Sequence, residues 1–192
     1  MWAAALDGPP PSPPSGRFEV RELDSAWANV AMEAESGLVP GRLARGSRCF
    51  GAWVGHELVG YGWLSTKPEW IGEVELEIAP GKGDAYIWNC VTLARHRRKG
   101  VFRSLVTAFV VQARTEGMAK LWIASAGDLA SNTLESAGFV KVMRFDTGSS
   151  LGFRWLRARM VEGAGASLRA AAGEVIAIKP GLSVRRAARR RH

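Results

Sequence analysis

The chain has 192 residues, of which 47% are hydrophobic and 23% are charged, and its formal net charge is +8. This balance is typical of one globular domain with a substantial core. No apolar run is long enough to span a bilayer, and residues 1–16 lack the charged start and continuous apolar core of a secretory signal, so these patterns indicate neither a membrane-spanning helix nor a signal peptide.

The positive charge is concentrated near the C-terminus. Five arginines with no acidic residue among them contribute +5 and leave +3 for the rest of the chain: Arg185, Arg186, Arg189, Arg190 and Arg191. The pI of 10.2 is therefore largely a property of this segment. Because no aromatic residues interleave with these arginines, we expect at most non-specific contacts of the tail with nucleic acid.

The two cysteines, Cys49 and Cys90, lie in apolar, strand-like segments. Two buried thiols in a reducing compartment explain this placement better than a disulfide or a metal pair, so we expect a cytoplasmic protein. The three histidines lack the spacing of metal ligands, and no metal site is predicted.

The first part of the chain divides by composition. Residues 1–16 are predicted to be a disordered leader, because residues 8–16 are rich in proline, serine and glycine. One domain is expected over residues 17–160, followed by an Ala/Gly-rich and Arg-rich tail over residues 161–192. Residues 17–23 predict a strand, and Asp24 or Ser25 is suited to cap the helix that follows.

A hairpin is predicted from residues 47–54 and 57–64. The two-residue connection Gly55-His56 suits a type II′ turn, which makes His56 a turn residue rather than a catalytic base.

Residues 70–78 predict a further strand with an acidic face. Glu73, Glu75 and Glu77 alternate with apolar residues, and a period of two places all three carboxylates on one side. This side is either a solvated face or an acidic wall that attracts a cationic amine or polarises a water molecule.

The most informative segment is residues 86–109. It begins as an apolar strand, continues through the basic segment Arg95-His96-Arg97-Arg98-Lys99, and enters an amphipathic helix after Gly100. A helix N-terminus leaves backbone N–H groups unpaired and favours negative charge, and glycine lets a phosphate approach closely. We therefore predict a phosphate site, more specifically for a pyrophosphate, at residues 97–102.

After this helix, which is expected to end at Gly117, residues 119–124 predict a short strand. A strand–helix–strand unit of this length favours parallel pairing with a right-handed crossover. Residues 128–138 predict a short helix with Asp128 as its N-cap. Residues 139–146 and 151–160 predict two closing strands around a turn at residues 147–149, and residues 174–178 are a candidate for one more strand.

Two of these segments carry a family resemblance. Arg97-x-x-Gly100-x-Phe102 resembles the pyrophosphate-binding signature Gln/Arg-x-x-Gly-x-Gly/Ala of the GCN5-related N-acetyltransferases (GNAT superfamily), and residues 128–139 resemble the late family segment that ends in Gly-Phe, here Gly138-Phe139. The resemblance covers roughly residues 17–160, with the two motifs in the family's order and spacing.

The resemblance implies a single α/β domain with a mixed, partly splayed β-sheet flanked by helices. It implies acetyl-CoA as acyl donor and an amine-bearing acceptor, with no membrane span. The residues that it assigns to acetyl-CoA are Cys90, Val91, Thr92, Leu93, Arg97, Arg98, Lys99, Gly100, Val101, Phe102, Asp128 and Ser131. The oligomeric state stays open, with a homodimer among the options.

Three positions depart from the family pattern. Phe102 stands where a small residue is usual, and Asp128 stands where the family has asparagine. Leu134 occupies the position at which many members have a tyrosine that protonates the departing thiolate. That acid is therefore not carried over to this chain.

Candidates for the remaining chemistry are Glu75 and Glu77 as general base and Asn89 as the residue that orients a water molecule. Cys90 is either an acyl-carrying nucleophile or, as we favour, a buried core thiol, because no activating base lies near it in sequence. Trp53, Trp63, Trp70 and Trp88 are expected mainly in the core, with one or two lining an acceptor pocket.

The sequence leaves three functions open. The first is acetyl transfer to a primary amine of an unidentified acceptor. The second is a CoA-binding module without catalysis, suggested by the missing tyrosine. The third is binding of nucleic acid or another anionic surface through the Arg-rich tail, which would weaken steeply with salt.

Overall fold

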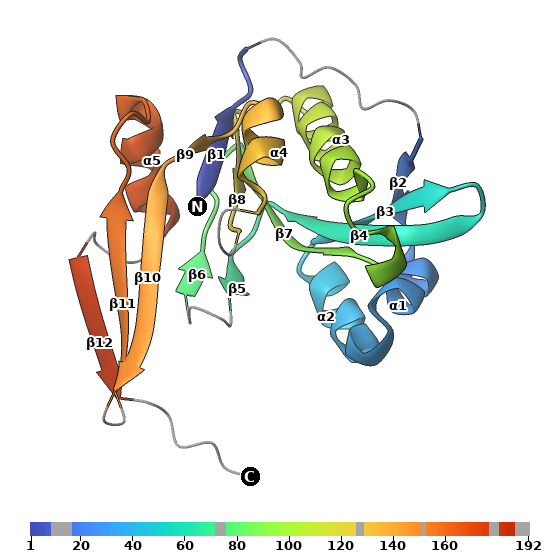
Figure 1. Cartoon of the computed structure of the whole chain (residues 1–192), viewed down its shortest axis with the longest axis horizontal. Helices are drawn as coiled ribbons and strands as arrows, with labels where there is room; N and C mark the ends of the chain where they lie inside the picture. The colour runs from blue at the N-terminus through green and yellow to red at the C-terminus, as the bar shows by residue number, and fades with distance from the viewer. Residues whose placement is uncertain (9–16, 72–75, 126–128, 151–152, 177–180, 187–192) are drawn as a thin grey trace.

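The computed structural model describes residues 1–8, 17–71, 76–125, 129–150, 153–176 and 181–186. Its centre is a seven-stranded sheet in the order β2-β3-β4-β7-β8-β1-β9 (Figure 1). The strands are β1 (Trp2–Ala5), β2 (Glu19–Leu23), β3 (Arg48–Val54), β4 (Glu57–Ser65), β7 (Asp84–Thr92), β8 (Lys120–Ile123) and β9 (Val140–Lys141). Only β7 and β8 pair in parallel, and the other neighbours are antiparallel, so the sheet is mixed.

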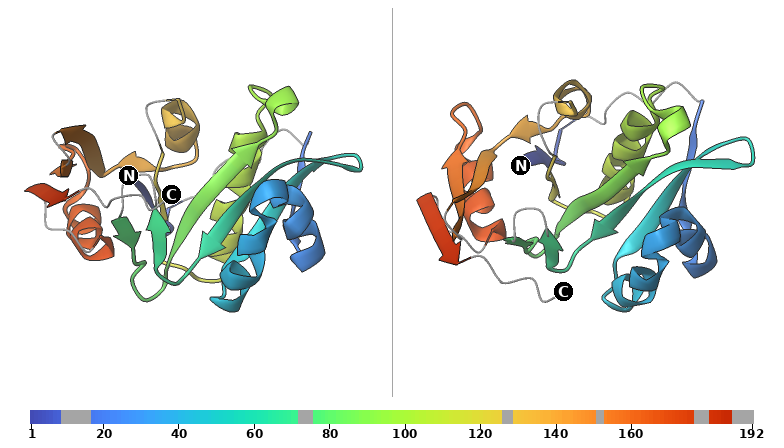
Figure 2. Two further views of the ribbon diagram at one scale, coloured as in Figure 1. Left: turned by 90° about the horizontal axis from the view of Figure 1, so that it is seen from below. Right: turned by 60° about the horizontal axis from the view of Figure 1, so that its bottom comes forward.

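Helices cover both faces of this sheet (Figure 2). On one face lie α3 (Val101–Thr115) and α4 (Ser131–Ser136), and their apolar residues share one core cluster with β3, β4, β7 and β8. In that cluster Phe109 meets the edge of Phe50 with ring centroids 5.1 Å apart. On the other face lie α1 (Ser25–Met32), the 3₁₀ helix η1 (Glu33–Leu38) and α2 (Val39–Ala44), packed over β3 and β4.

Beyond β9 the chain builds a second, three-stranded sheet in the order β10-β11-β12. It consists of β10 (Met143–Ser150), β11 (Phe153–Met160) and β12 (Gly181–Arg186). In the sequence, α5 (Ala166–Val175) lies between β11 and β12. A core cluster joins α5, β10 and β11 to Trp122 of β8 and to the short antiparallel pair β5 (Glu69–Ile71) and β6 (Leu76–Ile78). The second sheet is therefore attached through apolar packing.

The middle of the chain folds as the sequence predicts. β3 and β4 form the expected hairpin, and Gly55 has a φ of +58° in its turn. The Asp24 carboxylate caps α1 by accepting from the Trp27 N–H at 2.9 Å. The helix that follows the basic loop ends where Gly117 adopts a φ of +70°, and the next strand, β8, runs parallel to β7. The predicted mixed α/β fold is confirmed.

The predicted leader is wrong for its first residues. Trp2–Ala5 forms a strand between β8 and β9, where Trp2, Ala3 and Ala4 are almost fully buried. Pairing on both edges and apolar burial override the composition of the segment that follows, and residues 9–16 themselves lie outside the described part of the chain.

Three predictions for later segments also need correction. The strand expected over residues 70–78 is a pair of short strands, β5 and β6, with Trp70 opposite Glu77. The turn expected at residues 147–149 is part of β10, which continues to Ser150. The predicted tail contains α5, whose Ala172 and Val175 are buried, and β12, which gains a hydrogen-bonded neighbour in β11.

Within the described residues, no helix combines the length and apolar character needed to cross a membrane.

Candidate functional site

The site is built on an irregularity in β7. Tyr61 of β4 pairs with Val91 and Trp63 pairs with Trp88, so Gly62 faces two residues of β7, Asn89 and Cys90. This is a β-bulge, and Asn89 adopts a φ of +45° within it. Asparagine tolerates this left-handed backbone better than most residues do.

The bulge shifts the alternation of side chains along β7. Before it, Ala85 and Ile87 face the cluster under α3; after it, Cys90 faces the same cluster. Trp88 and Val91 both pack on the cluster under α1 and α2. The strand therefore keeps apolar groups on both faces while Asn89 is inserted between them.

One edge of β7 is open after the bulge. β7 pairs with β8 only from Asp84 to Ile87, and in the described residues its later part has a sheet neighbour only on the β4 side. Residues 88–92 are correspondingly half-buried, whereas residues 84–87 are buried. The sheet splays here, so the backbone groups of residues 90–92 that point away from β4 have no strand partner among the described residues and are available to a ligand.

Leu93 does not share this property. Its N–H donates to the carbonyl of Val59 at 3.0 Å, and its own carbonyl accepts from the N–H of His96 at 2.8 Å. Its predicted contact with the ligand would therefore have to displace an internal hydrogen bond, which makes Leu93 the weakest member of the predicted set.

The basic loop follows directly. We use this name for residues 97–100. Arg98 and Gly100 have φ values of +60° and +92°, and Gly100 is the N-cap of α3. A Cβ at Gly100 would have no heavy atom within 4 Å, so the backbone lies open on that side. The first intrahelical N–H is that of Ser104, which donates to Gly100 at 3.0 Å.

The N–H groups of Val101, Phe102 and Arg103 therefore point out of the helix end with no side-chain cap. Phe102 is larger than the residue usual in the family at this position, but its side chain packs against the core cluster under α3 and does not cover the helix end. Arg97, Arg98, Lys99 and Arg103 are exposed, and within the described residues none of them forms an ion pair. Unpaired donors, a helix dipole and free cations together favour a phosphate group.

Arg95, which precedes the basic loop, is paired with a carboxylate of the hairpin. Glu57, at the start of β4, accepts from Arg95 Nε at 2.8 Å and contacts His96 Nε2 at 3.2 Å. The hydrogen bond from Arg95 lowers the pKa of Glu57. These contacts tie η2 (Ala94–His96) to the hairpin and fix the start of the basic loop.

The second predicted motif contributes a buried hydroxyl. Ser131 begins α4, and its Oγ is buried with no hydrogen-bond partner in the part of the chain that the structure describes. Ala130 is the N-cap of this helix rather than Asp128, which lies outside the described residues. Leu134 is fully buried in the core cluster under α3. Its position therefore serves packing.

The predicted catalytic residues are only partly brought together. Asn89 lies in the bulge, and with its Oδ1 toward Arg42 it accepts from Nη1 at 2.7 Å and Nη2 at 3.1 Å. Glu75 lies outside the described residues, and Glu77 is exposed on β6, where it makes no hydrogen bond or ion pair with any described residue. Arg42 of α2 was not predicted, because only the folded chain brings it to Asn89.

The Cys90 side chain is half-buried and packs against the core cluster under α3. Burial raises the pKa of its thiol to about 12. Its Sγ lies 3.9 Å from the Trp88 carbonyl, and a Cβ on Gly62 would come within 2.8 Å of it. The favoured interpretation of Cys90 agrees with this burial, since a thiol with so high a pKa is a poor nucleophile near neutral pH.

The residues fit the acyl donor that the sequence implies. The open edge of β7 offers backbone donors and acceptors, the uncapped N-terminus of α3 offers N–H groups for a pyrophosphate, and the partnerless Ser131 hydroxyl offers a further donor.

Comparisons with known proteins identify the family of this chain. A family model described as the acetyltransferase (GNAT) family matches residues 15–139. A search of curated proteins gave no significant match. Among solved structures, a GCN5-related N-acetyltransferase from Kribbella flavida is 16% identical over 72% of this chain and 52% of that chain, with a TM-score of 0.50.

Two further structures are similar at lower TM-scores. A Bacillus subtilis acetyltransferase in complex with CoA is 18% identical over 68% of this chain and 77% of that chain, with a TM-score of 0.45. A ribosomal-protein-alanine N-acetyltransferase from Brucella melitensis is 17% identical over 62% of this chain and 86% of that chain, with a TM-score of 0.44. At such low identity the likeness concerns the fold alone. The family match, which covers both the bulged strand and the basic loop, shows that this chain belongs to the acetyltransferase (GNAT) family and is an N-acetyltransferase that uses acetyl-CoA.

Proposed function

We propose that this protein transfers the acetyl group of acetyl-CoA to a primary amine. The observation that carries the proposal is the open edge of β7, which leads directly into the basic loop and the uncapped N-terminus of α3. The diphosphate would lie at the N–H groups of Val101, Phe102 and Arg103, and the pantetheine would run along residues 90–92.

Main-chain groups supply most of the chemistry in this proposal. A backbone N–H on the open edge donates to the thioester oxygen and stabilises the negative charge that develops when the neutral amine attacks. The new C–N bond then forms fully, the C–S bond breaks, and the proton lost by the amine reaches the thiolate. Holding both reactants against one strand provides the effective concentration.

Asn89 has a narrower role than the sequence predicts. Its Oδ1 is taken by Arg42, so only its Nδ2 group is left to hold a water molecule. Glu75 and Glu77 stay candidates for the general base. Asp84 does not join them, because it is buried and accepts from Trp122 Nε1 at 3.0 Å.

A catalytically inactive CoA-binding module is the alternative, and buried Leu134 favours it. It predicts acetyl-CoA binding without turnover on any amine. We also propose a cytoplasmic location, which the two free cysteines support.

The test compares thermal stability with and without acetyl-CoA for the wild type and for Arg97→Glu/Gly100→Asp. A ligand that binds only the folded state raises the Tm by mass action. We expect a shift in the wild type, none in the double variant, and an unchanged shift in the control Arg169→Glu, which reverses an exposed charge on α5. No shift for the folded wild type at millimolar acetyl-CoA would overturn the proposal. Turnover on an amine panel then separates the enzyme from the inactive module.

A further inference from the structure

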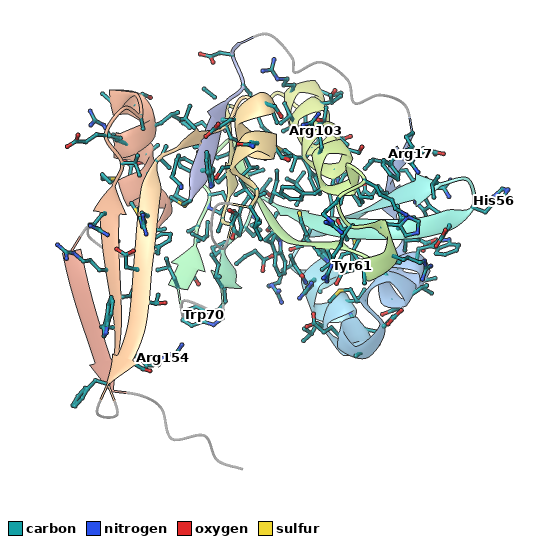
Figure 3. The ribbon with its side chains drawn as sticks, viewed as in Figure 1. Arg17, His56, Tyr61, Trp70, Arg103 and Arg154 are labelled. Atoms are coloured by element: carbon teal, nitrogen blue, oxygen red, sulfur yellow. The ribbon has the colours of Figure 1, made fainter. Side chains whose placement is uncertain are left out.

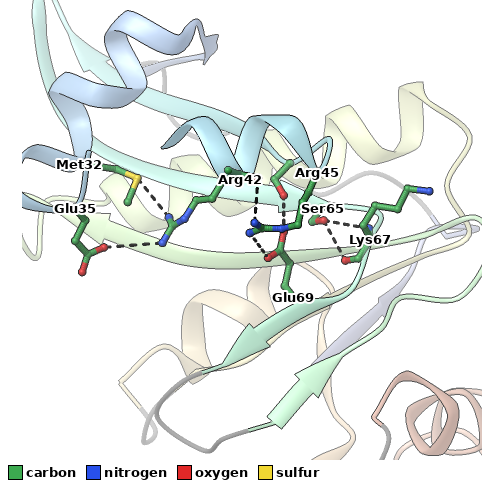
Figure 4. Close-up of polar contacts among 9 residues, drawn as sticks. Met32, Glu35, Arg42, Arg45, Ser65, Lys67 and Glu69 are labelled. Carbon is green, nitrogen blue, oxygen red and sulfur yellow. Dashed lines mark hydrogen bonds and ion pairs between the residues drawn. The ribbon is translucent and has the colours of Figure 1, made fainter. Parts of the chain in front are cut away.

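Arg42 is a buried cation beside the bulge. The residue is 7% exposed, and its guanidinium stacks on Trp88 and Trp63, with Cζ 4.4 Å and 5.1 Å from the two ring centroids. Its Nη1 also lies 3.4 Å from Met32 Sδ, and both Nη groups donate to Asn89 Oδ1 (Figure 4 shows the Met32 contact). All of these partners are neutral.

The charge of Arg42 is poorly compensated. Within the described residues its one carboxylate neighbour at ion-pair distance is Glu35, at 3.9 Å from Nη2, and that side chain is 60% exposed. The other acidic residue nearby, Glu69, is engaged by Ser47 and by Arg45, whose Nη2 lies 3.3 Å from it (Figure 4). Burial accordingly lowers the pKa of Arg42, although an arginine still stays charged.

Hydrogen-bond donors are in excess around this cation. The indole Nε1 atoms of Trp63 and Trp88 are both buried and find no acceptor among the described residues, and the two ring centroids are 6.0 Å apart. A buried unpaired donor destabilises a protein by about 1–3 kcal/mol, so such groups are rarely left without a reason. The guanidinium has one neutral oxygen acceptor, Asn89 Oδ1, and one exposed carboxylate at 3.9 Å, Glu35. A second carboxylate would bring the negative charge that the guanidinium needs and acceptor atoms for nearby donors.

We propose that Arg42 recognises a carboxylate of the acceptor, so that the substrate is an amine that also carries a carboxylate. This inference rests on the proposed function. Glu35 shows the direction of approach, because its exposed side chain already brings a carboxylate to 3.9 Å from the guanidinium. A substrate carboxylate that displaces Glu35 would bind Arg42, which is bonded to Asn89 of β7. The amine of the same substrate could then extend toward residues 90–92, along which the pantetheine is proposed to run.

The experiment compares amino acids with their carboxamides. Glycine, β-alanine, γ-aminobutyrate, glutamate and lysine are each paired with the corresponding C-terminal amide, and kcat/KM is measured for the wild type, Arg42→Met, Arg42→Lys and Arg45→Met. Arg45→Met is the matched control, because Arg45 lies on the same helix boundary but binds Glu69.

For the best acceptor pair we expect the wild type to prefer the carboxylate by about 10–100-fold, the range of a charge-assisted hydrogen bond. Arg42→Met should lose this preference through the KM of the carboxylate substrate while keeping the acetyl-CoA thermal shift, and Arg45→Met should keep the preference. Arg42→Lys should retain part of it, because a lysine keeps the charge but not the fork of donors. The retained thermal shift shows that the variants are folded.

Equal kcat/KM for both members of every pair, or a preference that survives in Arg42→Met, would overturn the inference. Absence of turnover with an intact acetyl-CoA shift would instead overturn the proposed function. In that case a binding experiment tests the inference. In the presence of CoA, at least one carboxylate-bearing amine should raise the Tm of the wild type and leave the Tm of Arg42→Met unchanged. If no such amine does so, the inferred carboxylate site is wrong.

Discussion

Two regions at the end of β7 handle positive charge in opposite ways. In the basic loop, residues 97–100, the cations stand in solvent next to an uncapped helix end. At the bulge, Arg42 is buried against two indole rings and bonded to Asn89 (Figure 3 labels Tyr61, the β4 residue that pairs across from Val91). Exposed cations cost little, attract ligands over a long range and are screened by salt, whereas a buried cation is costly and demands a specific partner.

The difference suggests a division of labour on one strand. The loop suits a highly charged ligand that many arrangements of cations can attract. The bulge suits a small group whose shape must match fixed donors. Four predictions test this contrast.

The largest effect concerns the buried side. Burial raises the pKa of both Cys90 and Cys49 to about 12, so at pH 8 their thiolate fractions lie about three orders of magnitude below that of an ordinary cysteine. Alkylation by iodoacetamide, followed by mass spectrometry, should be slower by a similar factor in the native protein than in urea. Rapid native labelling of Cys90 would mean that the bulge region is open to solvent.

The next effect concerns the loop. Arg97→Ala/Arg98→Ala/Lys99→Ala should weaken acetyl-CoA binding about 5–150-fold at low salt, because three charges that each contribute about 0.3–1 kcal/mol are removed. The difference in acetyl-CoA affinity between this variant and the wild type should become smaller as the salt concentration rises. Calorimetric titration at two salt concentrations measures this. Arg42→Met serves as the comparison and should leave the salt dependence of acetyl-CoA binding unchanged. If the loop variant also had the salt dependence of the wild type, the contrast between the two regions would be wrong.

A third prediction fixes the geometry of the bulge. In Gly62→Ala the new Cβ would approach Cys90 Sγ to 2.8 Å and Phe109 to 3.0 Å, so we expect a loss of about 1–3 kcal/mol in the free energy of unfolding. Urea denaturation measures it. Gly165→Ala, whose Cβ would meet nothing within 4 Å and whose φ is −55°, is the control. Adding Cys90→Ala should recover part of the loss, and strictly additive effects would place the thiol elsewhere.

The smallest effect concerns the anchor of the loop. The pKa of Glu57 is lowered in the folded state, chiefly by Arg95, so this carboxylate stabilises the fold above its unfolded pKa and loses that contribution as pH falls through its folded pKa. Because the pair is exposed, Glu57→Gln should lower the Tm only slightly at pH 7, and the difference should shrink as the pH falls through the folded pKa of Glu57. An NMR titration of the Glu57 carboxyl that gives an ordinary pKa would contradict this.

The sequence predicts those parts of the site that local pattern controls. The hairpin, the Asp24 cap, the strand into the basic loop and the glycine at the start of α3 all follow from residue type and spacing. Residue type alone does not place Trp27 of α1, which is 44% exposed and meets Trp53 in a T-shaped contact with ring centroids 4.8 Å apart.

Local sequence patterns do not reveal contacts between segments that lie far apart in the chain. Gly62 within a strand is a recognised hint of a bulge, but its position depends on β7, which comes later in the chain. Arg42 looks like an ordinary surface arginine on a short helix until α2 packs over Trp63 and Trp88. The composition of residues 1–16 indicates disorder, since nothing local reveals that Trp2–Ala5 has two strands to pair with.

The position of β1 sets an order of assembly. Trp2 pairs with Ile123 on one side and Lys141 on the other, so each pairing can form only after the chain has been synthesised beyond that partner. The hairpin of β3 and β4 can close much earlier, because its strands are adjacent in the sequence. Until β1 arrives, the outer edge of β8 has unpaired backbone groups beside apolar residues, a state prone to association with other chains. Refolding at high protein concentration should therefore fail at this last pairing, and the yield should improve on dilution.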